Sequence, residues 1–174
     1  MNDMMEMVAN LMALSSRTAP KAAGKDFIET KVIKGEELEK VAADMEQYGN
    51  ESGKANFDRD GNNVRNSEAM LLLSLNNAKN TGLNCGACGF EKCAELKTGS
   101  GLGAEFDGPW CAWRLIDLGI ALGSAVKTAS IHNADNRILY RAGVSAKRLG
   151  LIEGEVIVGI PISASGKNIY FDRG

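Results

Sequence analysis

The sequence has little of several residue types, and each shortage narrows the range of possible functions. It contains one histidine and four cysteines among 174 residues, and aromatic residues make up 6%. Its 20 basic and 22 acidic residues leave a formal net charge of −2, with no excess of one sign. Without a run of lysine and arginine, the sequence has no concentrated positive charge of the kind that binds nucleic acid or an anionic membrane surface. The histidine, His132, lies near the expected end of a helix, which favours a capping or surface role over catalysis.

Long hydrophobic runs are also missing. The nearest approach, residues 115–126, is shorter than the roughly 20 apolar residues that span a bilayer, and it contains Asp117. Residues 1–12 carry acidic groups and lack the basic region of a secretory signal. We therefore expect a cytoplasmic protein that does not contact membranes. Its length and 44% hydrophobic content allow one core, so we expect a single domain over residues 1–174.

The pattern of apolar residues predicts helices alternating with strands. Amphipathic or apolar helices are expected at 3–16, 35–49 and 110–129, and short helices at 90–97 and 145–151. Strands are expected at 27–33, 69–75, 137–142 and 155–162, of which 69–75 is apolar throughout, as a strand buried on both faces should be. Residues 49–66 are polar and are expected to be irregular or partly helical. In the first helix, one face for core or dimer packing is predicted from Met4, Met7, Val8, Leu11 and Met12. The order of elements favours an α/β or α+β domain around one sheet.

The cysteines carry the strongest functional signal. Their spacing is C-x2-C-x4-C-x17-C, formed by Cys85, Cys88, Cys93 and Cys111. In a reducing compartment, clustered cysteines are more often metal ligands than disulfides. Four thiolates can hold an iron–sulfur cluster or a structural zinc ion.

Three features favour a cluster over zinc. The spacing is one tight loop of three ligands plus a distant fourth, whereas zinc modules usually pair two C-x2-C knuckles. Gly86 and Gly89 flank the ligands, where backbone N–H groups could approach sulfur closely. The site also lies inside a larger domain that does not need zinc to fold. We predict a [4Fe–4S] cluster on the segment 81–112, with a [2Fe–2S] cluster, structural zinc and free or redox-active thiols as alternatives. Trp110 and Trp113 bracket the last ligand and are expected to pack beside the cluster.

The motif CGACGFEKC, residues 85–93, resembles the [4Fe–4S] motif of two groups of proteins. They are the B subunit of sodium-pumping electron-transport complexes and the large subunit of corrinoid iron–sulfur proteins. The chain as a whole resembles an uncharacterised family of ferredoxin-domain-containing proteins of bacteria and archaea. The stretches that carry this resemblance are RTAPKAAGKD, GLNCGACGFEKC, WRLIDLGIALGSAV and GIPISASGKNIYFDR. It covers nearly the whole chain and implies a ferredoxin-like domain without assigning an activity.

A further resemblance is to the FMN-dependent nitroreductase fold. Residues 9–33 resemble its helix, A-P-S-x-x-N loop and strand, residues 117–126 its dimer-forming helix, and residues 156–162 its last strand. This implies an α+β fold, with a central mostly antiparallel sheet flanked by helices and an inserted cysteine-rich iron–sulfur loop. It also implies a homodimer with FMN at the interface. The basic groups that could meet the flavin phosphate are Arg17, Lys21, Lys25, Lys167 and Arg173.

The chain departs from the nitroreductase pattern in two places. The arginine segment that grips the flavin phosphate in that family has no counterpart, and Lys21 and Gly24 replace the serine and asparagine of the loop. The function that the sequence favours is an iron–sulfur redox protein that exchanges electrons with a flavin or a small organic acceptor. A flavin would make it an FMN-dependent oxidoreductase. The alternatives are an electron carrier or redox sensor without flavin, acting with a redox partner protein, and a zinc-stapled interaction domain.

Overall fold

The computed structural model describes residues 2–101 and 103–171. Its helices are α1 (Asn2–Thr18), α2 (Glu36–Ser52), α3 (Phe57–Arg65), α4 (Ala112–Ile131) and α5 (Tyr140–Arg148). Its strands are β1 (Ile28–Ile33), β2 (Ala69–Leu75), β3 (Asp135–Asn136) and β4 (Val156–Ser163). Two 3-10 turns, η1 (Ala22–Gly24) and η2 (Cys93–Glu95), lie in the connections. None of the helices in this part of the chain is long and apolar enough to cross a membrane.

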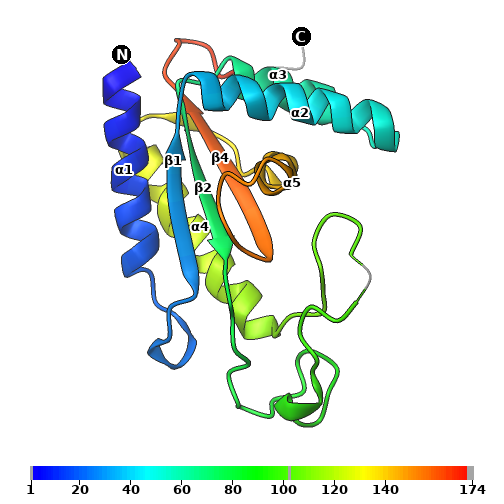
Figure 1. The fold of residues 1–174 in the computed structure, drawn as a ribbon. Coiled ribbons are helices and arrows are strands. Elements are labelled where there is room, and N and C mark those ends of the chain that lie inside the picture. Colours follow the sequence, from blue (N-terminus) through cyan, green and yellow to red (C-terminus); the bar gives the residue numbers. More distant parts are fainter. Residues whose placement is uncertain (1, 102, 172–174) are drawn as a thin grey trace.

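The strands form one sheet in the order β1-β2-β4-β3, and every neighbouring pair is antiparallel (Figure 1). At one end of the sheet, Leu75 of β2 lies opposite both Ile28 of β1 and Val156 of β4. At the other end, Ala69 of β2 pairs with Ile162 of β4. The expected α+β class and antiparallel sheet are confirmed.

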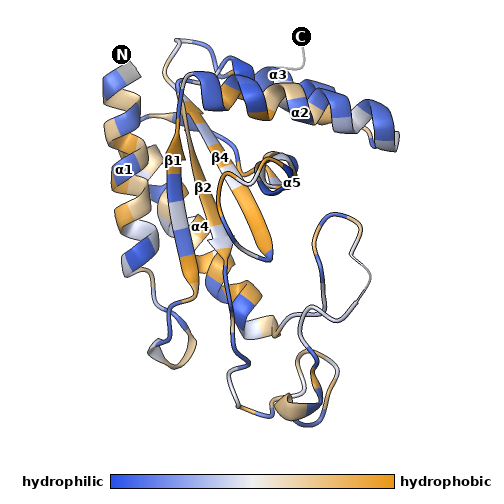
Figure 2. Ribbon diagram, in the orientation of Figure 1, coloured by the Kyte–Doolittle hydropathy of each residue, from blue (hydrophilic) through white to orange (hydrophobic). Residues whose placement is uncertain are grey.

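Helices cover both faces of the sheet. Because side chains alternate along a strand, Leu71 and Leu73 of β2 join the core formed with α1 and α4, while Met70 and Leu72 join the core formed with α2, α3 and α5. Every residue of β2 is buried, which explains its continuous apolar run. The apolar strands lie between the two helical layers in Figure 2.

The predicted strand at 137–142 is wrong. Strand β3 covers only Asp135–Asn136, and α5 has already begun at Tyr140. The alternation in RILYRA does not reveal the contact made by the next residue, Gly143. A Cβ on Gly143 would lie 1.8 Å from the carbonyl oxygen of Ile157 in β4. Only glycine lets the helix lie this close to the strand, and that contact overrides the local strand preference.

Two other expectations are revised. The expected face of α1 is divided, since Val8 and Met12 are buried whereas Met4, Met7 and Leu11 are exposed. The buried face of the helix is completed by other residues, among them Met5 and Ala9. The helix expected at 90–97 is limited to the η2 turn, and the polar stretch 49–66 contains the well-formed helix α3.

All four cysteines lie between β2 and α4, in residues 76–111, which we call the cysteine segment. It leaves the end of the sheet at which β1 and β4 begin, next to the loop that contains η1, and it extends beyond the sheet (Figure 1). The chain returns to the sheet at the start of α4. The fold therefore gathers the cysteine segment, the η1 loop and the first turn of α4 at one end of the molecule.

Candidate functional site

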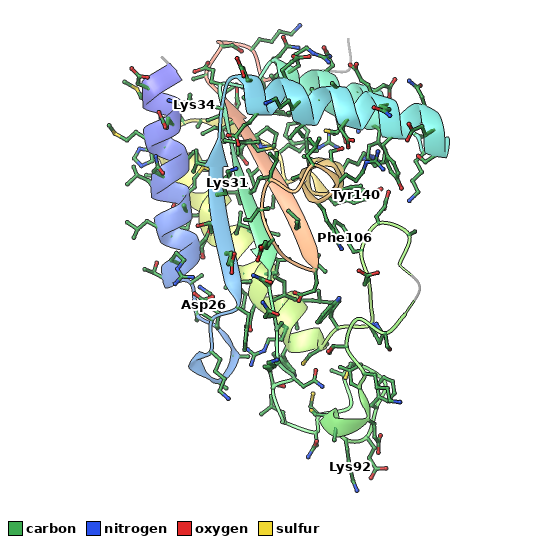
Figure 3. All side chains as sticks on the ribbon, viewed as in Figure 1. Asp26, Lys31, Lys34, Lys92, Phe106 and Tyr140 are labelled. Atoms are coloured by element: carbon green, nitrogen blue, oxygen red, sulfur yellow. The ribbon has the colours of Figure 1, made fainter. Side chains whose placement is uncertain are left out.

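The four cysteines are free thiols, and their exposure differs. Cys85 is exposed, Cys88 and Cys93 are partly buried, and Cys111 is buried. Figure 3 shows Lys92, beside η2, at the end of the segment farthest from the sheet. Phe106, in the same segment, lies back toward α5, where Lys147 stacks over its ring at 5.5 Å.

Cys111 is the residue that precedes the first turn of α4, where backbone amides have no partner within the helix. Burial raises the pKa of its thiol, but hydrogen bonds from Thr81 and from the amides of Trp113 and Arg114 outweigh this effect, so the pKa lies below its ordinary value. Thr81 Oγ1 lies 3.7 Å from the sulfur. These donors favour the thiolate, which is the form that binds metals.

Cys85 and Cys93 also receive N–H groups. Hydrogen bonds from the Ala87 amide and from the Trp113 indole lower the pKa of Cys85, and the indole Nε1 lies 3.1 Å from its sulfur. The Asn84 amide donates to the Cys93 sulfur at 3.3 Å, and the Cys93 amide donates back to Asn84 Oδ1 at 2.8 Å. Trp113 therefore links the exposed end of the segment to α4.

Gly86 and Gly89 flank the ligands, and the amide that follows Gly86, that of Ala87, donates to the Cys85 sulfur. Gly86 and Gly89 both have positive φ, 73° and 87°, and the Gly89 amide donates to the Gly86 carbonyl at 2.9 Å. A Cβ at either position would meet no atom within 4 Å. Glycine is therefore required by the backbone turn, and not by the space around it.

The donor set fits a thiolate-bound metal centre in its chemistry. All four candidate ligands are sulfur, and three of them accept hydrogen bonds from nearby N–H or O–H groups. Within residues 2–101 and 103–171, however, no three side chains of histidine, cysteine, aspartate or glutamate form one metal-holding group. The segment thus collects the ligands in one region without closing them into a cage, and binding would have to draw the sulfurs together.

Several residues of the site were not identified from the sequence, including Thr81 and Asn84. Arg114 and Asp117 were missed as well, although Asp117 had been noted as a charge in an apolar run. Both are buried, and Arg114 Nη1 lies 2.9 Å from Asp117 Oδ2. Two charges three residues apart in the most apolar helix are the signal that could have identified them, because buried charges are normally paired.

The basic groups expected at a flavin phosphate lie at two ends of the molecule. Arg17, Lys21 and Lys25 surround η1, whereas Lys167 follows β4 and lies beyond the opposite end of the sheet. At 3.3 Å per residue, β4 alone separates these ends by roughly 25 Å. The fifth predicted contact, Arg173, lies outside the described residues.

Two of the cations near η1 are already engaged. Lys21 Nζ donates to the carbonyls of Ser16 and Arg17 at 2.6 and 2.8 Å, and burial lowers its pKa. Arg17 forms an ion pair with Asp26 at 3.0 Å. Lys25 is exposed. The η1 loop therefore holds much of its positive charge in internal contacts.

Two cavities accompany these groups. One, of about 310 Å³, is mainly apolar and lies between the η1 loop and α4, with Leu83, Trp113, Ile116 and Ile120 among its lining residues. The other, of about 480 Å³, lies at the opposite end and is lined by Arg59, Asn62, Asn63, Asn66, Ser165, Lys167 and Ile169.

Comparison with known proteins gives two kinds of match. A family profile described as "uncharacterized protein containing a ferredoxin domain" matches residues 107–173, a range that includes Cys111 but not the other three cysteines. An uncharacterized protein from Archaeoglobus fulgidus is 50% identical over 172 residues, which is 99% of this chain and 93% of the relative.

Solved structures match in fold. A nitroreductase with bound FMN from Desulfitobacterium hafniense superposes with a TM-score of 0.57 at 14% identity, covering 92% of this chain and 78% of that one. A nitroreductase family protein from Clostridium novyi NT gives the same TM-score and identity, covering 94% and 77%. The chain therefore has the nitroreductase-like fold, as the sequence resemblance implied.

Proposed function

The chain belongs to the family of proteins containing a ferredoxin domain, and from that premise we propose that it is an iron–sulfur redox protein. The observation that carries the proposal is the surroundings of the cysteines. The sulfurs of Cys85, Cys93 and Cys111 each accept a hydrogen bond from a donor in the cysteine segment or in α4. Such bonds stabilise thiolates and help to set the potential of a cluster.

In this proposal, Cys85, Cys88, Cys93 and Cys111 are the ligands of one [4Fe–4S] cluster, which supplies single-electron exchange when bound. Residues 1–174 act as one domain, with 81–112 as its cluster-binding part. The setting is cytoplasmic and reducing, which keeps the four thiols available for the metal.

The test is the iron and acid-labile sulfide content of anaerobically purified protein, together with its far-UV circular dichroism. We expect about four iron atoms per chain, and loss of most of the iron in Cys88→Ser with the helical signal retained. Ser100→Ala, in the same segment, is the matched control and should keep its iron. Stoichiometric zinc, with Cys88→Ser unfolding, would instead support the zinc-stapled interaction domain.

We also propose that the protein binds FMN and passes electrons between the cluster and this flavin or a small organic acceptor. The 480 Å³ cavity supports the flavin because Arg59 and Lys167 line it, although Arg59 also pairs with Asp60 at 2.7 Å. Cationic side chains that line a cavity can donate hydrogen bonds to a phosphate. Without a flavin, the same protein would act as an electron carrier or redox sensor for a partner protein.

Titration of FMN, followed by quenching of its fluorescence, separates these two functions. We expect Lys167→Met to weaken binding, since it removes a cation from the cavity. Lys25→Met tests whether the η1 loop takes part. Because Lys25 and Lys167 lie at opposite ends of one chain, weakening by both variants would indicate a flavin shared between two chains. No saturable quenching by the wild-type protein would leave the carrier or sensor.

The third part of the proposal is a homodimer formed through α1 and α4. These helices lie side by side, with Ser15 Oγ and Ser16 Oγ donating to carbonyls of α4 at 3.2 Å. Their outer surface exposes large apolar side chains, namely Met4, Met7, Leu11, Leu14, Ile116 and Ile120. In the sequence, Gly119 lies between Ile116 and Ile120, and Gly123 follows them. A Cβ on either glycine would meet no atom within 4 Å. An apolar surface with small residues suits close approach of a second copy.

A further inference from the structure

A buried ion pair joins the start of α4 to the η1 loop. Arg114 is 1% exposed, and its Nη1 donates to Asp117 Oδ2 at 2.9 Å and to the carbonyls of Ala22 and Lys25 at 3.0 and 3.3 Å. Asp117 Oδ1 accepts the Ala22 amide at 2.8 Å. The guanidinium also lies over the ring of Phe27, 4.7 Å from its centre. Both charged groups of the pair, the guanidinium and the carboxylate, therefore hold the η1 loop against α4.

The same arginine reaches the cysteine segment. Its Nε donates to the carbonyl oxygen of Lys79 at 2.8 Å. The next residue, Asn80, donates from Nδ2 to the Cys93 carbonyl at 2.8 Å, and the residue after that, Thr81, contacts the Cys111 sulfur. Residues 79–81 therefore connect Arg114 with two of the four cysteines.

Arg114 is also close to the last cysteine along the chain. Its backbone amide donates to the Cys111 carbonyl at 2.9 Å and contributes a hydrogen bond to the Cys111 sulfur. Lysine could not make the same set of contacts, because a planar guanidinium presents donors in fixed directions whereas an ammonium is a single point of charge. Arg114 is also a buried cation three residues from Cys111, and screening by water is weak for buried charges.

We propose that Arg114 and Asp117 are positioning residues of the cysteine centre: Arg114 holds residues 79–81 against α4 and favours electron uptake by its positive charge, and Asp117 opposes that charge. The electrostatic half rests on the proposed iron–sulfur function. The positional half concerns the thiols alone and holds with or without a metal.

The electrostatic half is tested by the midpoint potential of the cluster-loaded protein. We expect Arg114→Met to lower the equilibrium constant for reduction about tenfold, which is about 59 mV for a one-electron couple. Asp117→Asn should shift the potential in the opposite direction, because it leaves the arginine uncompensated. Arg114→Lys keeps the charge and should restore most of the potential. Shifts of the same sign in Arg114→Met and Asp117→Asn would overturn this half, since they would indicate a shared structural loss.

Two controls isolate the position of the charge. Arg141 is a partly buried arginine that binds the buried Asp60 at 2.8 Å, between α3 and α5 on the other face of the sheet. Arg141→Met should lower stability and leave the potential unchanged. Lys79→Met removes an exposed charge beside the site and keeps the carbonyl that Arg114 binds, so it should shift the potential less than Arg114→Met does.

The positional half is tested on metal-free, reduced protein by the rate at which iodoacetamide alkylates each cysteine, followed by peptide mass spectrometry. Cys111 is 4% exposed, so its alkylation depends on opening of the segment. We expect Arg114→Met to speed alkylation of Cys111 by about tenfold or more, with the exposed Cys85 little changed, and Arg141→Met to leave both rates unchanged. An unchanged Cys111 rate in Arg114→Met would overturn this half. A protein without iron would refute the proposed function, whereas this assay would still decide the positional role.

Discussion

At Cys85, two N–H groups act on one exposed sulfur. The Ala87 amide and the Trp113 indole both lower its pKa, and the indole comes from α4, 28 positions along the chain. Both tryptophans near Cys111 are expected to pack beside a cluster, and the indole of Trp113 donates to the Cys85 sulfur. The Trp110 indole donates to the carbonyl of Asp107.

This difference predicts that two similar variants affect the pKa of Cys85 differently. Trp113→Phe removes a hydrogen bond that favours the Cys85 thiolate, so the pKa of Cys85 should rise. Its alkylation rate in metal-free protein should then reach half its maximum at higher pH. Trp110→Phe is the matched control and should leave the profile in place. A profile that moves equally in both variants would contradict the role given to the indole.

Tyr170 fixes the chain after β4. Its hydroxyl lies 2.9 Å from Ser67 Oγ, its carbonyl accepts Arg137 Nη1 at 3.0 Å, and its side chain is buried. Burial raises the pKa of Tyr170 to about 12, from an ordinary value of 10.0, although hydrogen bonds favour the phenolate. Because the folded pKa is the higher one, the stabilisation by the neutral phenol is complete below about pH 10 and is lost as the pH rises toward 12.

Tyr170→Phe should therefore act in two ways. At pH 7 the free energy of unfolding should fall by about 1 kcal/mol, because the hydrogen bond between the Tyr170 hydroxyl and Ser67 Oγ is lost. Above pH 10 the part of the alkaline loss that comes from Tyr170 should disappear. Denaturant unfolding at both pH values measures these effects. The exposed Tyr140 provides the control, since Tyr140→Phe should keep the alkaline loss; if Tyr140→Phe and Tyr170→Phe behaved alike, the assignment to Tyr170 would fail.

At the scale of elements, α4 connects every part of the site. Cys111 immediately precedes its first turn, which carries Trp113 and Arg114. Asp117 lies in the next turn, and the outer face carries Gly119 and Gly123. Two glycines on the exposed face of a 20-residue helix lower its stability by roughly 0.5–1 kcal/mol each compared with alanine. That loss is understandable if a second copy approaches there.

Gly123→Arg tests this surface. The protomer should not be destabilised, since a Cβ at Gly123 meets no atom within 4 Å and arginine favours a helix by roughly 1 kcal/mol over glycine. We expect the wild-type protein to be a dimer in analytical ultracentrifugation and Gly123→Arg to be a monomer. Gln47→Arg adds the same charge on the exposed side of α2 and should remain dimeric. A dimer that survives Gly123→Arg would place the interface elsewhere.

The elements that could be predicted from the sequence are those whose pattern follows directly from burial. The apolar run of β2 and the periodicity of α1, α2 and α4 reflect burial on two faces or one face, and all four were found. The start of α5 could not be predicted, because it depends on the contact of Gly143 with β4. The division of the α1 face was missed for a related reason. Spacing alone does not show which of two apolar faces packs on the sheet.

At the scale of the whole molecule, the candidate ligands were recognisable by residue type, but their surroundings were not. Thr81 and Asn84 reach Cys111 and Cys93 only through the path of the cysteine segment, and no periodic pattern records that path. The basic groups expected around one flavin phosphate were judged by charge alone, and the structure separates Lys25 from Lys167 by the length of the sheet. On one chain they cannot meet at one phosphate.

The central claim is that the cysteine segment holds an iron–sulfur cluster, and the visible spectrum of anaerobically purified protein tests it most directly. The measurement is made before and after addition of dithionite, with Cys88→Ser alongside. We expect a broad brown absorption that bleaches on reduction and is largely absent from the variant, with additional flavin bands if FMN is bound. A colourless wild-type protein that contains one zinc ion per chain would contradict the claim.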